Sequence, residues 1–187
     1  MPAREECTLR PLRESDLEIV LGWRNSERIR LQMYTDHEIT PDEHRRWFER
    51  VRNADETACY VLEVRDRPVG VVTVSRIDRR NGVCHWGFYV GDAEAPRGTG
   101  AALGFLGLEM LFETMSFRKV CGEVLGSNAA SLRFHERYGF VEEGRFARHV
   151  RKGGRYEDVI ALALFREQWV AEKPSLERKC FFGEKEA

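Results

Sequence analysis

The order of apolar and polar positions along the chain predicts alternating strands and helices. Short apolar or alternating runs predict strands over residues 7–12, 58–64, 69–77, 83–90, 120–125, 146–151 and 157–165. Apolar residues at helical spacing predict helices that begin near residues 16, 26 and 41 and that cover residues 101–115 and 129–138. With three consecutive antiparallel strands in the middle, this order predicts an α/β fold with a mixed sheet.

Local signals sharpen three of these elements. Thr40, Pro41 and Glu43 have the residue types of an N-cap, a first helical position and a capping box. Asn81-Gly82 is a strong hairpin signal between two strands. The helix over residues 101–115 is apolar nearly all round and contains no Lys or Arg, so we expect it to be buried against the sheet.

Length and charge set the broad class. The chain has 187 residues, 42% of them hydrophobic and 33% charged, which predicts one globular domain over residues 7–170 and a charged, peripheral tail over 171–187. A net charge of −1 gives no support to a nucleic-acid partner. No apolar run reaches membrane-spanning length and no signal region opens the chain, so no membrane association is expected.

The cysteines and histidines predict neither a disulfide framework nor a metal site. The five cysteines form no C-x-x-C pair, and three of them lie in apolar runs, which is typical of buried thiols in a cytoplasmic protein. The five histidines lack metal-ligand spacing, so we predict no bound metal.

A short glycine loop, residues 95–100, is the first candidate for chemistry. It follows a strand and opens the apolar helix, and the backbone amides of residues 97–102 can converge on an anion there. Gly98 and Gly100 permit a ligand to approach the backbone where a Cβ would obstruct it. Taken alone, such a loop is more often a plain turn. The strand, Asn128 and the Tyr138-Gly139-Phe140 segment that follow at suitable distances make a phosphate site the stronger interpretation.

Together these segments resemble the acetyl-coenzyme A site of the GNAT superfamily of N-acetyltransferases. The resemblance implies the GNAT acyl-CoA N-acyltransferase fold, with a mostly antiparallel central sheet flanked by helices and parallel strands that splay at the acetyl-CoA site. It implies contacts to acetyl-CoA from residues along these segments: Val90, Arg97, Gly98, Thr99, Gly100, Ala101, Asn128 and Ser131. One position departs from the common family pattern, because Ala95 stands where Gln or Arg is usual.

The same resemblance implies that Tyr138 is the general acid that protonates the departing thiolate. The alternative is that Tyr138 caps and packs the end of its helix. The general base is open: Glu123 could face the cleft, or it could be a solvated strand residue. His44 and His85 are ambiguous in the same way, with packing as the default for His44.

For the acceptor, the stretch from Leu21 to Trp47 and the segments around Val69 and Trp86 resemble one branch of the superfamily. This branch is the nucleotide-sugar N-acetyltransferase of pseudaminic acid biosynthesis, used for flagellin glycosylation. The resemblance implies acetylation of the 4-amino group of a UDP-linked 4-amino-4,6-dideoxy sugar. Candidate substrate-binding residues provide cations and aromatic or apolar surface: Arg24, Arg30, Met33, Tyr34, His44, Trp86 and Tyr89.

Two alternatives for the function stay open. One is a GNAT enzyme that acetylates a protein N-terminus, as the ribosomal-protein branch does. The other is a non-catalytic acyl-CoA-binding module. The oligomeric state is not readable from the sequence, and formation of a homodimer is compatible with the resemblance.

Overall fold

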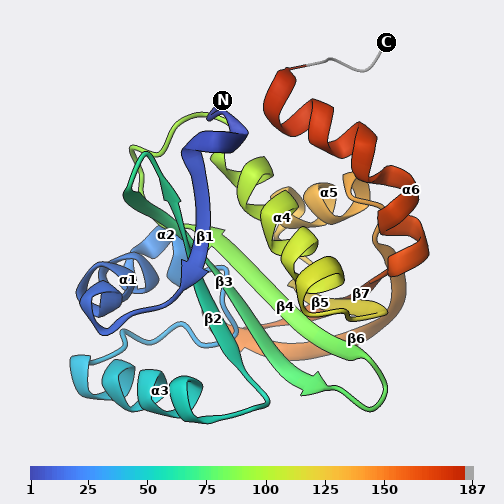
Figure 1. Cartoon of the computed structure of the whole chain (residues 1–187). Helices are drawn as coiled ribbons and strands as arrows, with labels where there is room; N and C mark the ends of the chain where they lie inside the picture. The colour runs from blue at the N-terminus through green and yellow to red at the C-terminus, as the bar shows by residue number, and fades with distance from the viewer. Residues whose placement is uncertain (184–187) are drawn as a thin grey trace.

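A single seven-stranded sheet organises the chain (Figure 1). The computed structural model describes residues 1–183. The strand order is β1-β2-β3-β4-β5-β7-β6, and every neighbouring pair is antiparallel except β4 and β5. The strands are β1 (Cys7–Pro11), β2 (Ala58–Val64), β3 (Arg67–Asp78), β4 (Val83–Val90), β5 (Lys119–Leu125), β6 (Val141–Lys152) and β7 (Arg155–Phe165). The mixed sheet and the α/β class predicted from the pattern are confirmed.

Helices cover both faces of the sheet (Figure 1). One face carries α1 (Leu17–Asn25), α2 (Glu27–Arg30) and α3 (Pro41–Asn53). The other face carries α4 (Thr99–Glu109), α5 (Ala129–Arg137) and α6 (Arg166–Glu177). Short 3₁₀ turns, Arg4–Glu6 and Glu14–Asp16, precede β1 and α1, and single π turns, Met110–Thr114 and Arg178–Phe182, extend α4 and α6.

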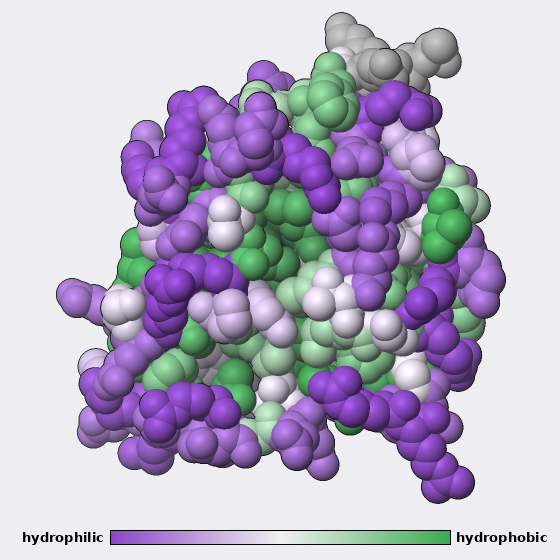
Figure 2. All heavy atoms as spheres, in the orientation of Figure 1, coloured by the Kyte–Doolittle hydropathy of each residue, from purple (hydrophilic) through white to green (hydrophobic). Residues whose placement is uncertain are grey.

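Alternation along the strands divides the buried residues between these two faces. In β3, Val72 and Val74 join the large core around α4, whereas Val71 faces α1 and α3. In that smaller cluster Val71 packs with Val20 and Trp23 of α1. Helix α4 is buried on nearly all sides, as its apolar sequence predicts, and Figure 2 shows hydrophobic atoms over it within a frame of hydrophilic residues.

The parallel pair β4–β5 is hydrogen-bonded over a short length only. Its register runs from Val83 opposite Lys119 to His85 opposite Cys121 and then ends. Beyond that point the remaining residues of β4 keep pairing with β3, and those of β5 keep pairing with β7. The two central strands therefore part, and the gap between them opens toward the start of α4.

The charged segment after residue 170 corrects the expectation of a peripheral tail. Residues 171–183 continue α6 and its π turn, and Leu176, Cys180 and Phe181 are buried in the large core beside α4. These three side chains stabilise the fold through burial, so this segment belongs to the domain. The last predicted tail residues, 184–187, lie outside the described residues.

Candidate active site

A cavity of about 960 Å³ occupies the gap between the parted strands and continues under α1, α2 and α3. Its walls come from both faces of the sheet, because β4 and β5 contribute residues on each side of the gap. A smaller hollow of about 330 Å³ lies beside it, at the glycine loop. Val90, Arg28 and Gly100 line both spaces, so the two hollows form one continuous site.

The glycine loop is a backbone cradle. Gly98 is the N-cap of α4 and has a φ of +93°, a conformation that other residues rarely adopt. The Thr99 hydroxyl donates to the Pro96 carbonyl at 2.7 Å, and the Ala101 amide donates to the Gly98 carbonyl at 3.0 Å. Among residues 1–183 the Gly100 amide has no backbone acceptor, and it sits at a helix N-terminus, where anions bind.

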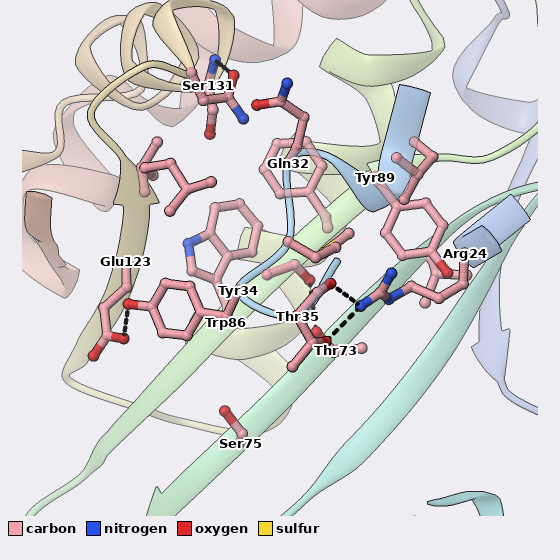
Figure 3. Close-up of a pocket in the computed structure, with 18 of the residues that line it drawn as sticks. Arg24, Gln32, Tyr34, Thr35, Thr73, Ser75, Trp86, Tyr89, Glu123 and Ser131 are labelled. Carbon is pink, nitrogen blue, oxygen red and sulfur yellow. Dashed lines mark hydrogen bonds between the residues drawn. The ribbon is translucent and has the colours of Figure 1, made fainter. Parts of the chain in front are cut away.

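Asn128 builds the opposite wall at the start of α5. Its side-chain oxygen accepts a hydrogen bond from the Ser131 amide at 3.0 Å, which makes Asn128 the N-cap that the sequence predicts. Both residues line the cavity, and Ser131 points toward it in Figure 3.

Three predicted coenzyme contacts have other positions or partners. Arg97 is exposed and does not line the cavity, Thr99 is nearly fully buried with its hydroxyl turned into the loop, and Ala101 lies behind the loop. Of these three residues, Thr99 lines the smaller hollow at the loop. The side-chain part of these predictions stays untested.

Tyr138 does not reach the cavity. It is 4% exposed, its hydroxyl donates to the Ala101 carbonyl at 2.8 Å, and the Cys180 sulfur lies 3.0 Å away. Burial raises the pKa of Tyr138 well above its usual range. An acid role requires this hydroxyl to leave Ala101, so that role stays a prediction. One turn earlier His135 does line the cavity, and its Nδ1 donates to the Ser131 carbonyl at 2.8 Å.

Glu123 faces the cavity, where it is the centre of a polar network. Tyr34 donates its hydroxyl to Oε2 at 2.5 Å, and Arg76 donates to Oε1 at 2.7 Å. The His85 ring lies 3.7 Å from the same carboxylate. Figure 3 shows Tyr34 and Glu123 meeting across the cavity from elements 89 residues apart in the sequence. Of the two positions weighed from sequence, Glu123 therefore has the cavity-facing one, and its role as base remains a prediction.

The network fixes the charge of its members. Burial alone would raise the pKa of Glu123, but the hydrogen bonds from Tyr34 and Arg76 outweigh it and lower that pKa. Burial, together with the nearby Arg76, lowers the pKa of His85. Near neutral pH the site therefore holds a carboxylate beside a neutral imidazole, both able to accept a proton.

The acceptor side of the cavity is lined by all but one of the predicted substrate-binding residues. Arg24 donates to the Thr35 carbonyl and hydroxyl, while its other terminal nitrogen is buried without a partner. In Figure 3 the Tyr89 ring lies beside this guanidinium. Arg30 does not line the cavity but donates to the Asp36 carbonyl in the loop over residues 31–39, so its contact with a substrate stays a prediction.

Several cavity residues were missed by sequence reasoning. The largest set lies on one face of α3: Glu43, Arg46, Trp47 and Arg50 recur at helical spacing and all line the cavity. That spacing is readable from sequence, but it is equally typical of an ordinary amphipathic helix. Arg28 was missed too, although it donates to the Val90 and Gly91 carbonyls next to the glycine loop.

A family model for the acetyltransferase (GNAT) domain matches residues 6–141, which is most of the chain. The chain belongs to the GNAT acetyltransferase family. Its fold is the GNAT fold implied by the sequence resemblance, and the parted β4–β5 pair corresponds to the predicted splayed strands. This GNAT enzyme is an acyltransferase that uses acetyl-CoA.

Individual relatives agree at the level of family and fold. An uncharacterized N-acetyltransferase of Bacillus subtilis, YokL, derived from the SPbeta prophage, is 28% identical over 167 residues, covering 88% of this chain and 93% of its own. Among solved structures, spermidine N-acetyltransferase from Vibrio cholerae in complex with CoA and spermine has a TM-score of 0.83 at 20% identity, covering 89% of this chain and 99% of that one. A GCN5-related N-acetyltransferase from Brucella melitensis has a TM-score of 0.75 at 23% identity, covering 92% and 81%.

The residues around the loop fit an acetyl-CoA molecule. A Cβ built on Gly100 would meet one neighbouring atom, a Val90 methyl at the ordinary contact distance of 3.7 Å, and both residues line the site. Gly98, Gly100, Val90 and Asn128 would hold the phosphates and the pantetheine arm, and the coenzyme supplies the activated acetyl group. No helix within residues 1–183 combines the length and apolar character needed to cross a membrane.

Proposed function

We propose that this GNAT enzyme acetylates the 4-amino group of a UDP-linked 4-amino-4,6-dideoxy sugar, the acceptor of pseudaminic acid biosynthesis and flagellin glycosylation. A cytoplasmic location and a homodimer are compatible with this proposal. The observation that carries it is the charge of the acceptor side of the cavity, which favours an amine attached to an anion.

Arginines dominate the charged lining. The cavity is lined by five of them, Arg24, Arg28, Arg46, Arg50 and Arg76, against two carboxylates, Glu43 and Glu123. Both carboxylates already accept hydrogen bonds, Glu43 from the Thr40 amide in the capping box of α3 and Glu123 from Arg76 and Tyr34. The surplus positive charge attracts an anionic acceptor such as a diphosphate.

The positive charge of the lining favours a different kind of acceptor from the polyamine of a structural neighbour. The Vibrio cholerae enzyme is a spermidine N-acetyltransferase, and a polyamine carries several positive charges. Such a cation would be repelled by the arginine-rich lining here, where each carboxylate is already occupied. A nucleotide-linked amine has complementary charge, and aromatic side chains such as Tyr89 and Trp47 provide surface for its rings.

The chemistry requires two proton transfers around one acyl transfer. The acceptor nitrogen must be neutral to form its bond to the acetyl carbon, and it loses a proton as the carbon–sulfur bond breaks. Glu123 and His85 are positioned to accept that proton. The departing thiolate gains a proton, and the candidate donor is Tyr138, once its hydroxyl leaves Ala101.

A thiol-release assay with acetyl-CoA tests the acceptor. It compares the UDP-linked amino sugar, the same sugar without the nucleotide, spermidine and a ribosomal N-terminal peptide at equal concentration. We expect turnover with the UDP-linked compound to exceed that with the free sugar by at least about a hundredfold, since the free sugar lacks the anion.

Other results of this assay would reject the proposed acceptor. Turnover with spermidine or with the peptide alone would keep the acetyl-CoA site and reject the nucleotide-sugar acceptor. Binding of the coenzyme without transfer to any of the four amines would favour the non-catalytic acyl-CoA-binding module.

A further inference from the structure

The two sides of α3 differ in how their arginines are used. Away from the cavity, Arg45 donates to Glu14 at 2.9 Å and Arg52 pairs with Glu49 at 3.3 Å. On the cavity side, Arg46 and Arg50 have no hydrogen bond or ion pair with any residue in the described range 1–183. Helix α3 therefore presents two unpaired guanidinium groups to the cavity, whereas its other two arginines are paired with carboxylates.

The spacing of this pair suits two adjacent anionic groups. Arg46 and Arg50 are one helical turn apart, which places their Cβ atoms about 5–6 Å from each other on one face of the helix. Guanidinium groups bind phosphate oxygens through paired N–H donors, and an unpaired guanidinium on a cavity wall keeps those donors available.

An aromatic surface lies on the same helix, beside a buried imidazole. The Trp47 ring stacks on the His44 ring, with centroids 4.9 Å apart and planes 19° apart. His44 lines the cavity and is 5% exposed, and its Nε2 is buried from solvent with no hydrogen-bond partner among residues 1–183. Burial lowers the pKa of His44, so this imidazole is neutral and adds no positive charge behind the Trp47 ring.

We propose that this face of α3 binds the nucleoside diphosphate end of the acceptor. Arg46 and Arg50 hold the two phosphates, and Trp47, whose ring stacks on His44, contacts the base. This subsite deepens the proposed function and rests on it. It is separate from the coenzyme phosphates, which the glycine loop on the other side of the parted strands would hold.

Calorimetric titration of the full chain with UDP tests the subsite. The protein is first saturated with CoA, so that UDP cannot occupy the coenzyme's own phosphate cradle. We expect the double variant Arg46→Gln/Arg50→Gln to bind UDP at least about tenfold more weakly, because two charge-assisted phosphate contacts are lost. The matched control, Arg45→Gln/Arg52→Gln, removes the same charge from the same helix and is expected to keep the wild-type affinity. CoA affinity should be unchanged in both.

Three results would overturn the subsite: no UDP binding to the CoA-saturated wild type, equal losses in the two double variants, or no loss in Arg46→Gln/Arg50→Gln. Its failure is distinguishable from that of the proposed function. Acetyl transfer to the UDP-linked amino sugar with an unchanged KM in Arg46→Gln/Arg50→Gln would reject the subsite and keep the function. UDP binding that depends on these two arginines, without transfer to that sugar, would support the subsite and reject the function.

Discussion

The two halves of the active site are built from different parts of the chain. The coenzyme half is mostly backbone: a glycine with positive φ at the start of α4, free amides, and an N-cap at the start of α5. The acceptor half is mostly side chains from α1, α2, α3, the loop over residues 31–39 and β5, and its central contact joins Tyr34 to Glu123.

This difference determines which substitutions each half tolerates. A backbone cradle depends on conformation and open space, so a single added methyl group is the change that damages it. A side-chain wall depends on charges and hydrogen bonds, and an isosteric change of one polar atom is enough to alter it. Each prediction below therefore uses a change of one atom or one small group.

The largest expected effect concerns the support of the acceptor half. Arg10 donates two hydrogen bonds to the Asp16 carboxylate, at 2.7 and 2.9 Å. Asp16 is 4% exposed and directly precedes α1. Asp16→Asn removes one of the two counter-charges of the buried Arg10 guanidinium and leaves only Glu63, at 2.6 Å, so we expect the free energy of unfolding to fall by roughly 3 kcal/mol. Urea denaturation measures this. The matched surface variant Glu14→Gln, which only loses an exposed pair with Arg45, should change it by less than about 0.5 kcal/mol.

The same pair gives a pH dependence. Burial alone would raise the pKa of Asp16, but the hydrogen bonds from Arg10 and from the Arg13 amide outweigh it and lower that pKa below 3.8. Asp16 therefore contributes stability above pH 3.8 that is lost as the pH falls through its lower folded value. The stability difference between wild type and Asp16→Asn should shrink over that acidic range, and a difference that stays constant would contradict the assignment.

Tyr138→Phe tests whether a residue at the back of the coenzyme half takes part in the chemistry. An acid role predicts that kcat falls by about two orders of magnitude while coenzyme affinity stays the same. A packing role predicts a loss of about 1 kcal/mol in unfolding free energy, from the bond to Ala101, with kcat almost unchanged. Steady-state kinetics and denaturation of the same preparation separate the two. The second result would reject the acid role for Tyr138.

Gly100→Ala tests the backbone cradle directly. The added Cβ meets only ordinary contact distances, and alanine favours a helix, so the unfolding free energy should not fall. The methyl group enters the space where the coenzyme approaches, and we expect the dissociation constant of CoA to rise about tenfold. Gly22→Ala is the control, since its Cβ meets nothing within 4 Å and it lies on α1. Equal CoA affinity in the two variants would mean that the loop does not approach the coenzyme.

Tyr34→Phe has the smallest expected effect. It removes one hydrogen bond to Glu123, so the lowered pKa of that carboxyl should rise toward its ordinary value of 4.5. Because Glu123 has a depressed pKa in the fold, its contribution to stability is present above pH 4.5 and is lost as the pH falls. NMR titration of the Glu123 carboxyl carbon measures the change. An unshifted titration would show that the Tyr34 bond is absent in solution.

Much of the fold was predictable because its signals are local. The hairpin at Asn81-Gly82, the capping box at Thr40 and the apolar α4 each depend on a few neighbouring residues. The buried C-terminal segment was missed because charged residues and Pro174 hide the helical spacing of Trp169, Leu176 and Cys180.

The site divides in the same way. The glycine loop and Asn128 were predicted, since a backbone cradle needs a particular local pattern. The partners of Glu123 were not, because Tyr34 lies 89 residues and Arg76 47 residues away, and no local pattern records such a pairing. Arg46 and Arg50 were visible only as the polar side of an amphipathic helix, and their lack of partners appears only in three dimensions.

Arg28 joins the two halves physically. Its guanidinium extends from α2, in the acceptor wall, to the Val90 and Gly91 carbonyls at the end of the strand that leads into the glycine loop. These two hydrogen bonds connect the strand end at the coenzyme side to the wall at the acceptor side. If acetyl-CoA changes the affinity for the acceptor by some factor, the acceptor must change the affinity for acetyl-CoA by the same factor, so Arg28 gives the two substrates a route to thermodynamic cooperativity.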